Sequence, residues 1–153
     1  MDDLIFVKHA CGAPGLRYLG LGPKLKPLRG IKKLKKLFNE NTSWAKKRST
    51  ESIKKMLSKS EVLVSAWRKN HLVGFGRAVS DETYRTVLWD IVVEKNYQGL
   101  GLGKRIVNMI INDPKIYKSE KIYVMTTHCE NFYKNIGFNN EDNQSLMIYQ
   151  QNK

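Results

Sequence analysis

Three glycines stand at alternate positions in the stretch QGLGLGK, residues 98–104, directly after the apolar run TVLWDIVVE. Glycine in such a place indicates that the backbone turns sharply or lies close against a ligand. The helix expected to follow has Lys104 and Arg105 in its first turn, where free amides carry partial positive charge. A strand, a glycine loop and a basic helix start together favour the binding of a phosphate group.

Two well-known phosphate-binding motifs do not fit this loop. The dinucleotide-binding G-x-G-x-x-G opens a parallel βαβ unit, whereas Gly99, Gly101 and Gly103 follow strands expected to be antiparallel and lack the last glycine of that spacing. A Walker loop needs a four-residue spacer and a hydroxyl after its lysine, and GLGLGK has neither. Taken alone, the loop is also compatible with a plain tight turn.

Candidates for acid–base chemistry lie outside the loop. Asp90 interrupts an apolar run, so it is either a hydrogen-bonded structural acid or a catalytic one. By themselves, Tyr133 is most often a core aromatic and His128 a cap or surface residue. Cys11 and Cys129 are too few for a disulfide scaffold or a zinc site, so we expect a reducing compartment and no structural metal.

The hydrophobic periodicity predicts the elements that position these residues. Expected helices cover residues 31–38, 53–57, 102–111 and 130–136, and expected strands cover residues 4–7, 17–20, 61–69, 71–79, 86–94, 121–127 and 146–150. Residues 61–79 are predicted to form a hairpin that turns at Lys69-Asn70. This order predicts an α+β (mixed α/β) fold in one domain, residues 1–153, with a sheet covered by helices. The sequence pattern predicts least about residues 1–30.

Composition limits the classes of protein that the chain can belong to. No apolar stretch approaches the length of a membrane span, and the start MDDLIFVKHA lacks the features of a signal peptide, so we expect a protein that is not secreted. The net charge of +13 is concentrated in residues 24–60. Such a field attracts nucleic acid, an acidic surface or a small polyanion, although compositional drift would also produce a solvated lysine face.

Three linked motifs give the chain a family resemblance. The loop at 98–103 resembles the Q/R-x-x-G-x-G/A loop of the GNAT superfamily of N-acetyltransferases, and the preceding strand and FYKNIGF (132–138) resemble the other two hallmarks in the same order. More narrowly, WDIVVEKNYQGLGLGKRIV and NFYKNIGF are similar to the plant, cyanobacterial and plastid-encoded serotonin N-acetyltransferase-like group. The resemblance covers residues 60–138 and does not extend to the first 30.

The resemblance implies a GNAT fold, with a mostly antiparallel sheet splayed open around the pantetheine arm of acetyl-CoA. In this family the tyrosine of the last motif points at the thiol sulfur, so Tyr133 is expected to be the general acid. Asp90 is the first candidate for the base, with Glu94 and His128 as alternatives. The residues expected to bind acetyl-CoA are Ile91, Val92, Val93, Gln98, Gly99, Leu100, Gly101, Leu102, Gly103, Lys104 and Tyr133. Direct attack on the thioester needs no acyl-enzyme, so Cys129 need not be a nucleophile.

The acceptor and the setting are less constrained by the resemblance. It implies that the acceptor is a primary amine, an arylalkylamine such as serotonin. Trp44, Trp89 and Phe132 are candidates for the walls of the acceptor pocket. A protein lysine or N-terminal amine is the alternative, and Thr126 and Thr127 stand where many relatives have Asn or Asp. A second class of function is a basic nucleic-acid or acidic-partner binding module with an inactive core. The protein is expected in a plastid or in the cytoplasm of a cyanobacterium-like cell. It is expected to be a monomer or a homodimer and to have no membrane partner.

Overall fold

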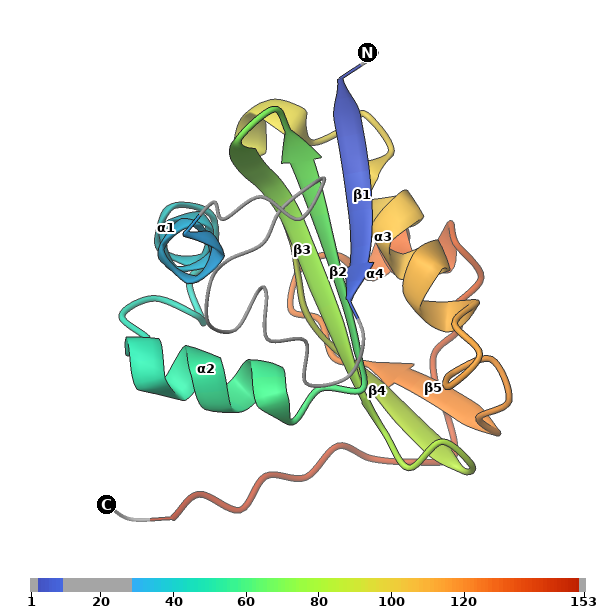
Figure 1. Cartoon of the computed structure of the whole chain (residues 1–153). Coiled ribbons are helices and arrows are strands. Elements are labelled where there is room, and N and C mark those ends of the chain that lie inside the picture. The colour runs from blue at the N-terminus through green and yellow to red at the C-terminus, as the bar shows by residue number, and fades with distance from the viewer. Residues whose placement is uncertain (1–2, 10–28, 152–153) are drawn as a thin grey trace.

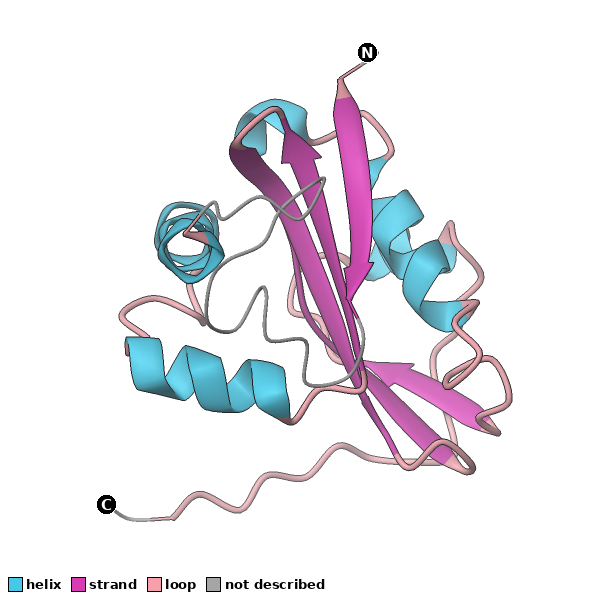
Figure 2. Cartoon of the chain, in the orientation of Figure 1, coloured by secondary structure: helices cyan, strands magenta, loops and turns pink. Residues whose placement is uncertain are grey.

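The structure, a computed structural model, describes residues 3–9 and 29–151 of the chain. A sheet of five strands in the order β1-β2-β3-β4-β5 is flanked by helices on both faces (Figures 1 and 2). The strands are β1 (Leu4–His9), β2 (Val62–Arg68), β3 (His71–Ser80), β4 (Arg85–Val93) and β5 (Lys121–Val124). The helices are α1 (Gly30–Asn41), α2 (Thr50–Ser58), the 3-10 turn η3 (Lys95–Tyr97), α3 (Leu102–Ile111) and α4 (Glu130–Lys134).

The first four strands pair in antiparallel fashion, and β5 pairs with β4 in parallel. Parallel neighbours need a crossover connection, and α3 supplies it between β4 and β5. The α+β fold and the mostly antiparallel sheet predicted from the sequence are confirmed.

The helices cover opposite faces of the sheet: α1 and α2 lie on one face and α3 on the other (Figure 1). Side chains of β2 therefore alternate between two cores, because successive residues of a strand point to opposite faces. Leu63 and Trp67 belong to the core with α1 and α2, whereas Val64 and Ala66 belong to the core with α3. Burial on both faces fixes the register of the central strands.

Two glycines of β3 let α3 approach the sheet closely. A Cβ at Gly74 would lie 2.9 Å from Cδ1 of Ile106, and a Cβ at Gly76 would lie 2.6 Å from Cγ2 of the same side chain. A side chain at either position would displace Ile106, so the glycines allow the middle of α3 to pack closely against β3.

The β4 strand contains a β-bulge. Phe75 pairs with Val92 and Arg77 pairs with Trp89, so Gly76 faces the two residues Asp90 and Ile91. Asp90 has φ of +53°, a left-handed conformation that a non-glycine residue rarely adopts. The bulge bends the strand and takes one residue out of the ladder with β3.

The β4 and β5 strands separate just before this bulge. Their ladder runs from Arg85 paired with Lys121 to Leu88 paired with Val124 and ends there. From Trp89 to Val93, β4 has β3 on one side, and the described residues place no strand on the other. This open edge is the splay that the resemblance implied.

Most expected elements are present, and one is wrong. Residues 146–150, expected as a final strand, are irregular and exposed. They are apolar enough for a strand but have no ladder partner among the described residues. The short strand expected at residues 17–20 lies outside the described part of the chain. No helix within residues 3–9 and 29–151 is long and apolar enough to cross a membrane.

Candidate active site

The glycine loop joins the open end of β4 to α3. After β4 the chain makes the η3 turn, and the side-chain amide of Gln98 then donates a hydrogen bond to the carbonyl oxygen of Val93 at 3.0 Å. Gly99 and Gly101 have φ of +75° and +79°, in the left-handed region where glycine is favoured. A Cβ at either position would meet nothing within 4 Å, so the conformation, and not crowding, accounts for these two glycines.

The N-terminus of α3 begins at Gly101, its N-cap residue. No side chain in the described part of the chain, residues 3–9 and 29–151, accepts a hydrogen bond from the first turn. The first amides of a helix have no partners within the helix and carry partial positive charge. An anion can therefore reach these amides over the glycine backbone.

Side chains of the loop have different environments. Leu100 is 47% exposed, whereas Leu102 is buried in the core beneath α3, which leaves only the backbone of Leu102 to meet a ligand. Gly103 lies against α4, because a Cβ there would be 3.2 Å from Cζ of Phe132. This contact joins the loop directly to the helix that carries Tyr133.

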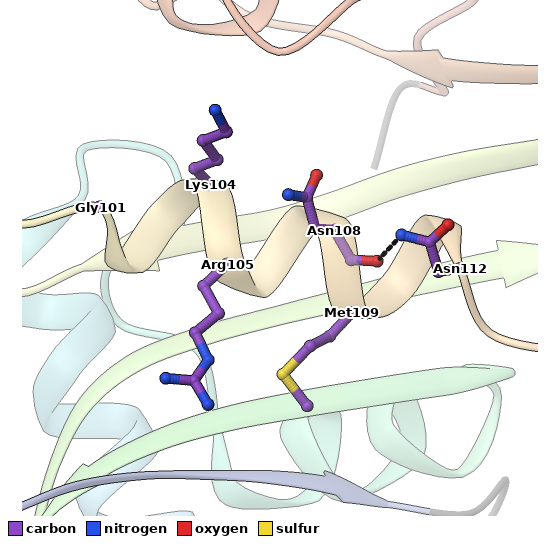
Figure 3. Close-up of a pocket in the computed structure, with 6 residues that line it drawn as sticks. All are labelled: Gly101, Lys104, Arg105, Asn108, Met109 and Asn112. Carbon is purple, nitrogen blue, oxygen red and sulfur yellow. Dashed lines mark hydrogen bonds between the residues drawn. The ribbon is translucent and has the colours of Figure 1, made fainter.

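A shallow pocket of about 480 Å³ runs along α3 from the loop (Figure 3). Lys104 and Arg105 point in opposite directions from the helix. The guanidinium of Arg105 lies 4.1 Å from the ring centroid of Phe6, which holds it against β1. Lys104 makes no ion pair with any described residue, so its ammonium is available to a ligand. The pocket is lined by Gly101, Lys104, Arg105, Asn108, Met109 and Asn112.

Asp90, at the bulge, lies between two arginines. Its side chain is 1% exposed, and its two carboxylate oxygens accept hydrogen bonds from Arg48 at 3.0 Å and from Arg77 at 2.7 Å. Burial alone would raise the pKa of this carboxyl, but the hydrogen bonds and charges of Arg48 and Arg77 outweigh burial and lower its pKa. Of the two roles left open by the sequence, this environment favours the structural acid. The catalytic role stays a prediction.

Arg48 and Arg77 were not identified from the sequence. Arg48 comes from the segment between α1 and α2, and Arg77 from β3, so neither is near Asp90 along the chain. An acid within an apolar strand implies a cationic partner, but not which one. Arg77 also lies over Trp89, with its guanidinium carbon 5.8 Å from the ring centroid.

Tyr133 lies in α4 between two aromatic rings. Its ring centroid is 4.9 Å from that of Phe132 and 5.6 Å from that of Phe138, both in edge-to-face geometry. Burial, and secondarily the nearby Cys129 thiol, raises the pKa of Tyr133 to about 12. The hydroxyl therefore keeps its proton at neutral pH and can donate it.

A cavity of about 790 Å³ adjoins Tyr133 at the outer side of β5. It contains carboxylate, ammonium, amide and hydroxyl side chains as well as apolar ones. Its lining residues are Val87, Ile122, Tyr123, Val124, Met125, Thr126, Thr127, Glu130, Tyr133, Lys134, Phe138, Asn139, Asn140, Glu141, Gln144, Ser145 and Leu146.

The other candidates from the sequence are placed as follows. The side chains of Glu94 and His71 are in hydrogen-bond contact, with 2.5 Å between Oε2 and Nε2, on the side where β4 meets β3. His128 is exposed in the segment between β5 and α4. Trp44 is 63% exposed in the segment between α1 and α2, and Cys129 is a free, exposed cysteine. No cluster of metal-binding side chains occurs in residues 3–9 and 29–151.

Comparison with known proteins decides the family. Residues 32–147 match the acetyltransferase (GNAT) domain family. The chain belongs to the GNAT family. The expected superfamily and fold are thus confirmed, and the assignment of the β4 edge, the glycine loop and Tyr133 to the three GNAT motifs stays a prediction.

Relatives of this GNAT chain include the group that the sequence pointed to. The N-acetyltransferase ycf52 of Porphyra purpurea is 34% identical over 107 residues, which cover 65% of this chain and 59% of the relative. The chloroplastic serotonin N-acetyltransferase 2 of Oryza sativa subsp. japonica is 34% identical over 74 residues, which cover 44% of this chain and 36% of the relative. The match thus spans less than two thirds of the length of each of these relatives.

Solved GNAT structures share the whole fold. The GNAT family protein SP0256 of Streptococcus pneumoniae TIGR4 superposes with a TM-score of 0.73 and 18% identity, over 98% of this chain and 99% of that one. At this identity the likeness shows the fold alone.

Proposed function

We propose that this GNAT protein transfers an acetyl group from acetyl-CoA directly to a primary amine. The observation that carries the proposal is the open edge of β4 from Trp89 to Val93, which leads straight into a glycine loop and an uncapped helix start. An extended chain with amide groups can pair with such an edge, and phosphates can bind at such a helix start. Acetyl-CoA has both parts in one molecule.

Two segments of this surface would hold acetyl-CoA. The main chain of β4 over Ile91, Val92 and Val93 would supply the edge for the pantetheine amides, and the amides of the loop from Gln98 to Gly103 would hold the pyrophosphate. Lys104 adds a cation at the same helix start. The hydrogen bond from Gln98 to the Val93 carbonyl fixes the loop relative to the strand, which keeps the two binding segments in register.

The reaction is direct acyl transfer. The nitrogen lone pair of a neutral amine attacks the thioester carbonyl carbon, a C–N bond forms and the C–S bond breaks, and the amine loses a proton while the thiolate gains one. The carbonyl oxygen carries negative charge in between. A main-chain N–H released by the bulge near Ile91 would stabilise that charge.

Tyr133 is the proposed acid. A hydroxyl with a pKa of about 12 stays protonated throughout the working range and can donate to the departing thiolate. The rings of Phe132 and Phe138 fix the orientation of the phenol. The raised pKa makes this phenol a weaker acid than a thiol with a pKa of about 8.5, so the tyrosinate left after donation must regain its proton from solvent.

Asp90 has a different proposed role. With its pKa lowered by two guanidinium groups, it is a weak proton acceptor, although it is ionised at any pH where an amine reacts. We assign it to holding the bulge against Arg48 and Arg77, and we propose that the amine proton leaves through water. Direct proton transfer to Asp90 is the competing assignment, and the Asn variant described in the Discussion separates the two.

The proposed acceptor is an arylalkylamine such as serotonin, and the proposed setting is a plastid. Similarity to the rice serotonin N-acetyltransferase supports both, over the 44% of this chain that is matched. Trp89, which is 38% exposed beside the bulge, can provide an aromatic wall. A peptide lysine or N-terminal amine is the competing acceptor class.

An acetylation assay tests the proposed function. The purified protein is given acetyl-CoA with serotonin, a lysine peptide and a peptide with a free N-terminus in separate reactions, and products are identified by mass spectrometry. Serotonin should be acetylated at its primary amine with the highest kcat/KM. Preference for a peptide would overturn the acceptor assignment, and absence of any product with CoA release at background would overturn the enzymatic one.

A further inference from the structure

The layer formed by α1, α2 and the segment between them concentrates positive charge on one side of the molecule. Residues 29–60 contain nine lysines and two arginines against two glutamates. The apolar sides of both helices pack on the sheet, so their polar sides form the outer surface of this layer (Figure 1). Its lysines, which together make up the basic face, are all exposed or half-buried: Lys32, Lys33, Lys35, Lys36, Lys46, Lys47, Lys54, Lys55 and Lys59.

The lysines of the basic face have few acidic partners. Within the described part of the chain, the one ion pair that any of them forms joins Lys36 to Glu40 at 3.9 Å. On other elements, Lys115, Lys121 and Lys134 each form a closer ion pair with a glutamate. Clustered like charges repel one another, and a bound polyanion relieves this repulsion. The basic face is therefore suited to a polyanionic partner.

Trp44 lies exposed in the segment that joins α1 to α2. Its side chain is 63% exposed, whereas Trp67 is fully buried and Trp89 is 38% exposed. Lys46 and Lys47 follow it closely in sequence and are exposed as well. An indole ring in this setting offers a flat apolar surface surrounded by cations.

The loop that carries Trp44 is firmly anchored. The hydroxyl of Thr42 donates to a carbonyl oxygen of α1 at 2.8 Å and accepts a hydrogen bond from the amide of Ala45 at 3.1 Å. Ala45 is fully buried, and the amide of Lys47 donates to the side-chain oxygen of Asn39 at 3.0 Å. Contacts on both sides of Trp44 thus hold the backbone in place while the indole faces solvent.

We propose that the basic face binds single-stranded nucleic acid, with Trp44 stacked on a base and the neighbouring lysines bound to phosphates. Proteins that bind single strands without reading their sequence combine a basic surface with aromatic side chains on which bases stack. Neither contact involves the sugar, so RNA and DNA strands should bind about equally well. Bases of a duplex are stacked on one another, so a duplex should bind more weakly.

Two other polyanions match the basic face less well. A helix that binds an anionic membrane inserts its apolar side among the lipids, but the apolar sides of α1 and α2 are occupied by the protein core, in which Leu34, Leu37 and Ile53 are buried. An acidic polypeptide offers carboxylates to the lysines but lacks the row of flat bases that would stack on Trp44.

The basic face is separate from the proposed phosphate site of acetyl-CoA. That site is at the start of α3, next to Lys104, and α3 lies on the opposite face of the sheet from α1 and α2 (Figure 1). A nucleic-acid strand and CoA should therefore bind at the same time. Strand binding does not depend on acetyl transfer, so either proposal can fail without the other.

Fluorescence anisotropy with a labelled oligouridine of about twelve nucleotides tests the proposal on the full chain. The logarithm of the association constant should fall with the logarithm of salt concentration with a slope of about −3, as expected when about four phosphates are neutralised. Lys46→Ala/Lys47→Ala should weaken binding and reduce this slope by about 1.4. The control Lys115→Ala/Lys121→Ala removes the same charge from other elements and should change the Kd by only a few-fold.

Substitutions of Trp44 test the stacking separately from charge. Trp44→Ala should raise the Kd by about tenfold or more at constant salt and leave the salt slope unchanged. Trp44→Tyr should keep the affinity within a few-fold, because a phenol ring also stacks, and should remove the quenching of tryptophan fluorescence that the strand causes in wild type. The exposed position of Trp44 means that both variants should keep their far-UV circular dichroism.

Several results would overturn the proposal. No binding of oligouridine at about 100 μM protein in low salt would do so, as would an equal loss of affinity in the Lys115→Ala/Lys121→Ala control. Displacement of the strand by CoA would place it at the α3 site instead. Equal affinity for polyglutamate, for anionic vesicles or for a duplex of the same length would show that charge alone attracts the partner. An unchanged Kd in Trp44→Ala, with a changed KM for the amine, would make Trp44 a wall of the acceptor pocket.

Discussion

The ring of Phe132 packs directly on the backbone of Gly103: a Cβ at that glycine would lie 3.2 Å from Cζ of the ring. This contact joins the first turn of α3, where phosphate is proposed to bind, to the helix that carries Tyr133. The two ends of the proposed cofactor site are therefore coupled through one glycine. Any side chain added there must displace the aromatic ring next to the proposed acid.

Gly103→Ala should reduce turnover without unfolding the protein. Alanine favours the helix by about 0.5–1 kcal/mol, which offsets part of the overpacking against Phe132. We expect kcat to fall about tenfold while the melting temperature changes by a few degrees, measured by steady-state kinetics and calorimetry. Adding Phe132→Leu should make room and recover part of the lost kcat. If Gly103→Ala alone has wild-type kinetics, the coupling is absent.

Tyr133→Phe removes one oxygen and keeps the packing of the ring. General-acid catalysis typically accelerates a reaction by about 10²- to 10⁴-fold. A thiol with a pKa of about 8.5 is already a fair leaving group, so we expect kcat to fall by about 10²-fold. The affinity for acetyl-CoA should stay within a few-fold. Wild-type turnover, under conditions where chemistry limits the rate, would make Tyr133 only a wall of the cavity.

Lys104 and Arg105 should have separable roles, although they are neighbours in sequence. Lys104→Ala should weaken acetyl-CoA binding several-fold at low salt, and less at high salt, because its ammonium acts through charge. Arg105→Ala should leave affinity nearly unchanged and lower stability by about 0.5–1 kcal/mol, because its guanidinium is stacked on Phe6. Titration calorimetry and thermal unfolding on both variants check the contrast. The reverse pattern would place the phosphates on the Arg105 side of α3.

The substitution Asp90→Asn should affect the free energy of unfolding more than the catalytic rate. Breaking a buried ion pair by removing one partner costs about 3–5 kcal/mol, and Asn keeps part of the hydrogen bonding, so a loss near the lower end of this range is expected. Glu120→Gln, which breaks an exposed pair with Arg85, is the control and should cost less than about 1 kcal/mol. At a temperature where Asp90→Asn is folded, its kcat should lie within about tenfold of wild type. A loss of a thousandfold or more with intact folding would make Asp90 the base.

The ion pairs of Asp90 with Arg48 and Arg77 make the stability of the folded protein depend on pH. The folded-state pKa of Asp90 lies below its ordinary value, so its contribution is present above the unfolded pKa of about 3.9 and is lost as pH falls through the lower, folded value. The difference in unfolding free energy between wild type and Asp90→Asn should therefore shrink on acidification below about pH 4. A difference independent of pH would show that the ion pairs are not its source.

The sequence predicted those features that depend on neighbours along the chain. The β2–β3 hairpin, α3 and the glycine loop follow from alternation, helical spacing and glycine placement within short windows. The partners of Asp90 could not be read in this way, because Arg48 and Arg77 reach it from separate elements. The bulge at Asp90 was also unpredicted, since its left-handed φ occurs at a residue other than glycine. Residues 146–150 were predicted to form a strand from their apolar character, but apolar character alone does not specify a pairing partner.

Binding of acetyl-CoA to the protein as purified, without added metal, tests the central claim most directly. Titration calorimetry with wild type, Lys104→Ala and Tyr133→Phe, next to a thermal-shift measurement, would report affinity and stabilisation together. We expect one acetyl-CoA per chain, a higher melting temperature on binding, weaker binding for Lys104→Ala and nearly unchanged binding for Tyr133→Phe. No heat and no thermal shift at about millimolar acetyl-CoA, with DNA or RNA bound instead in a strongly salt-dependent manner, would contradict this expectation and favour a basic binding module with an inactive core.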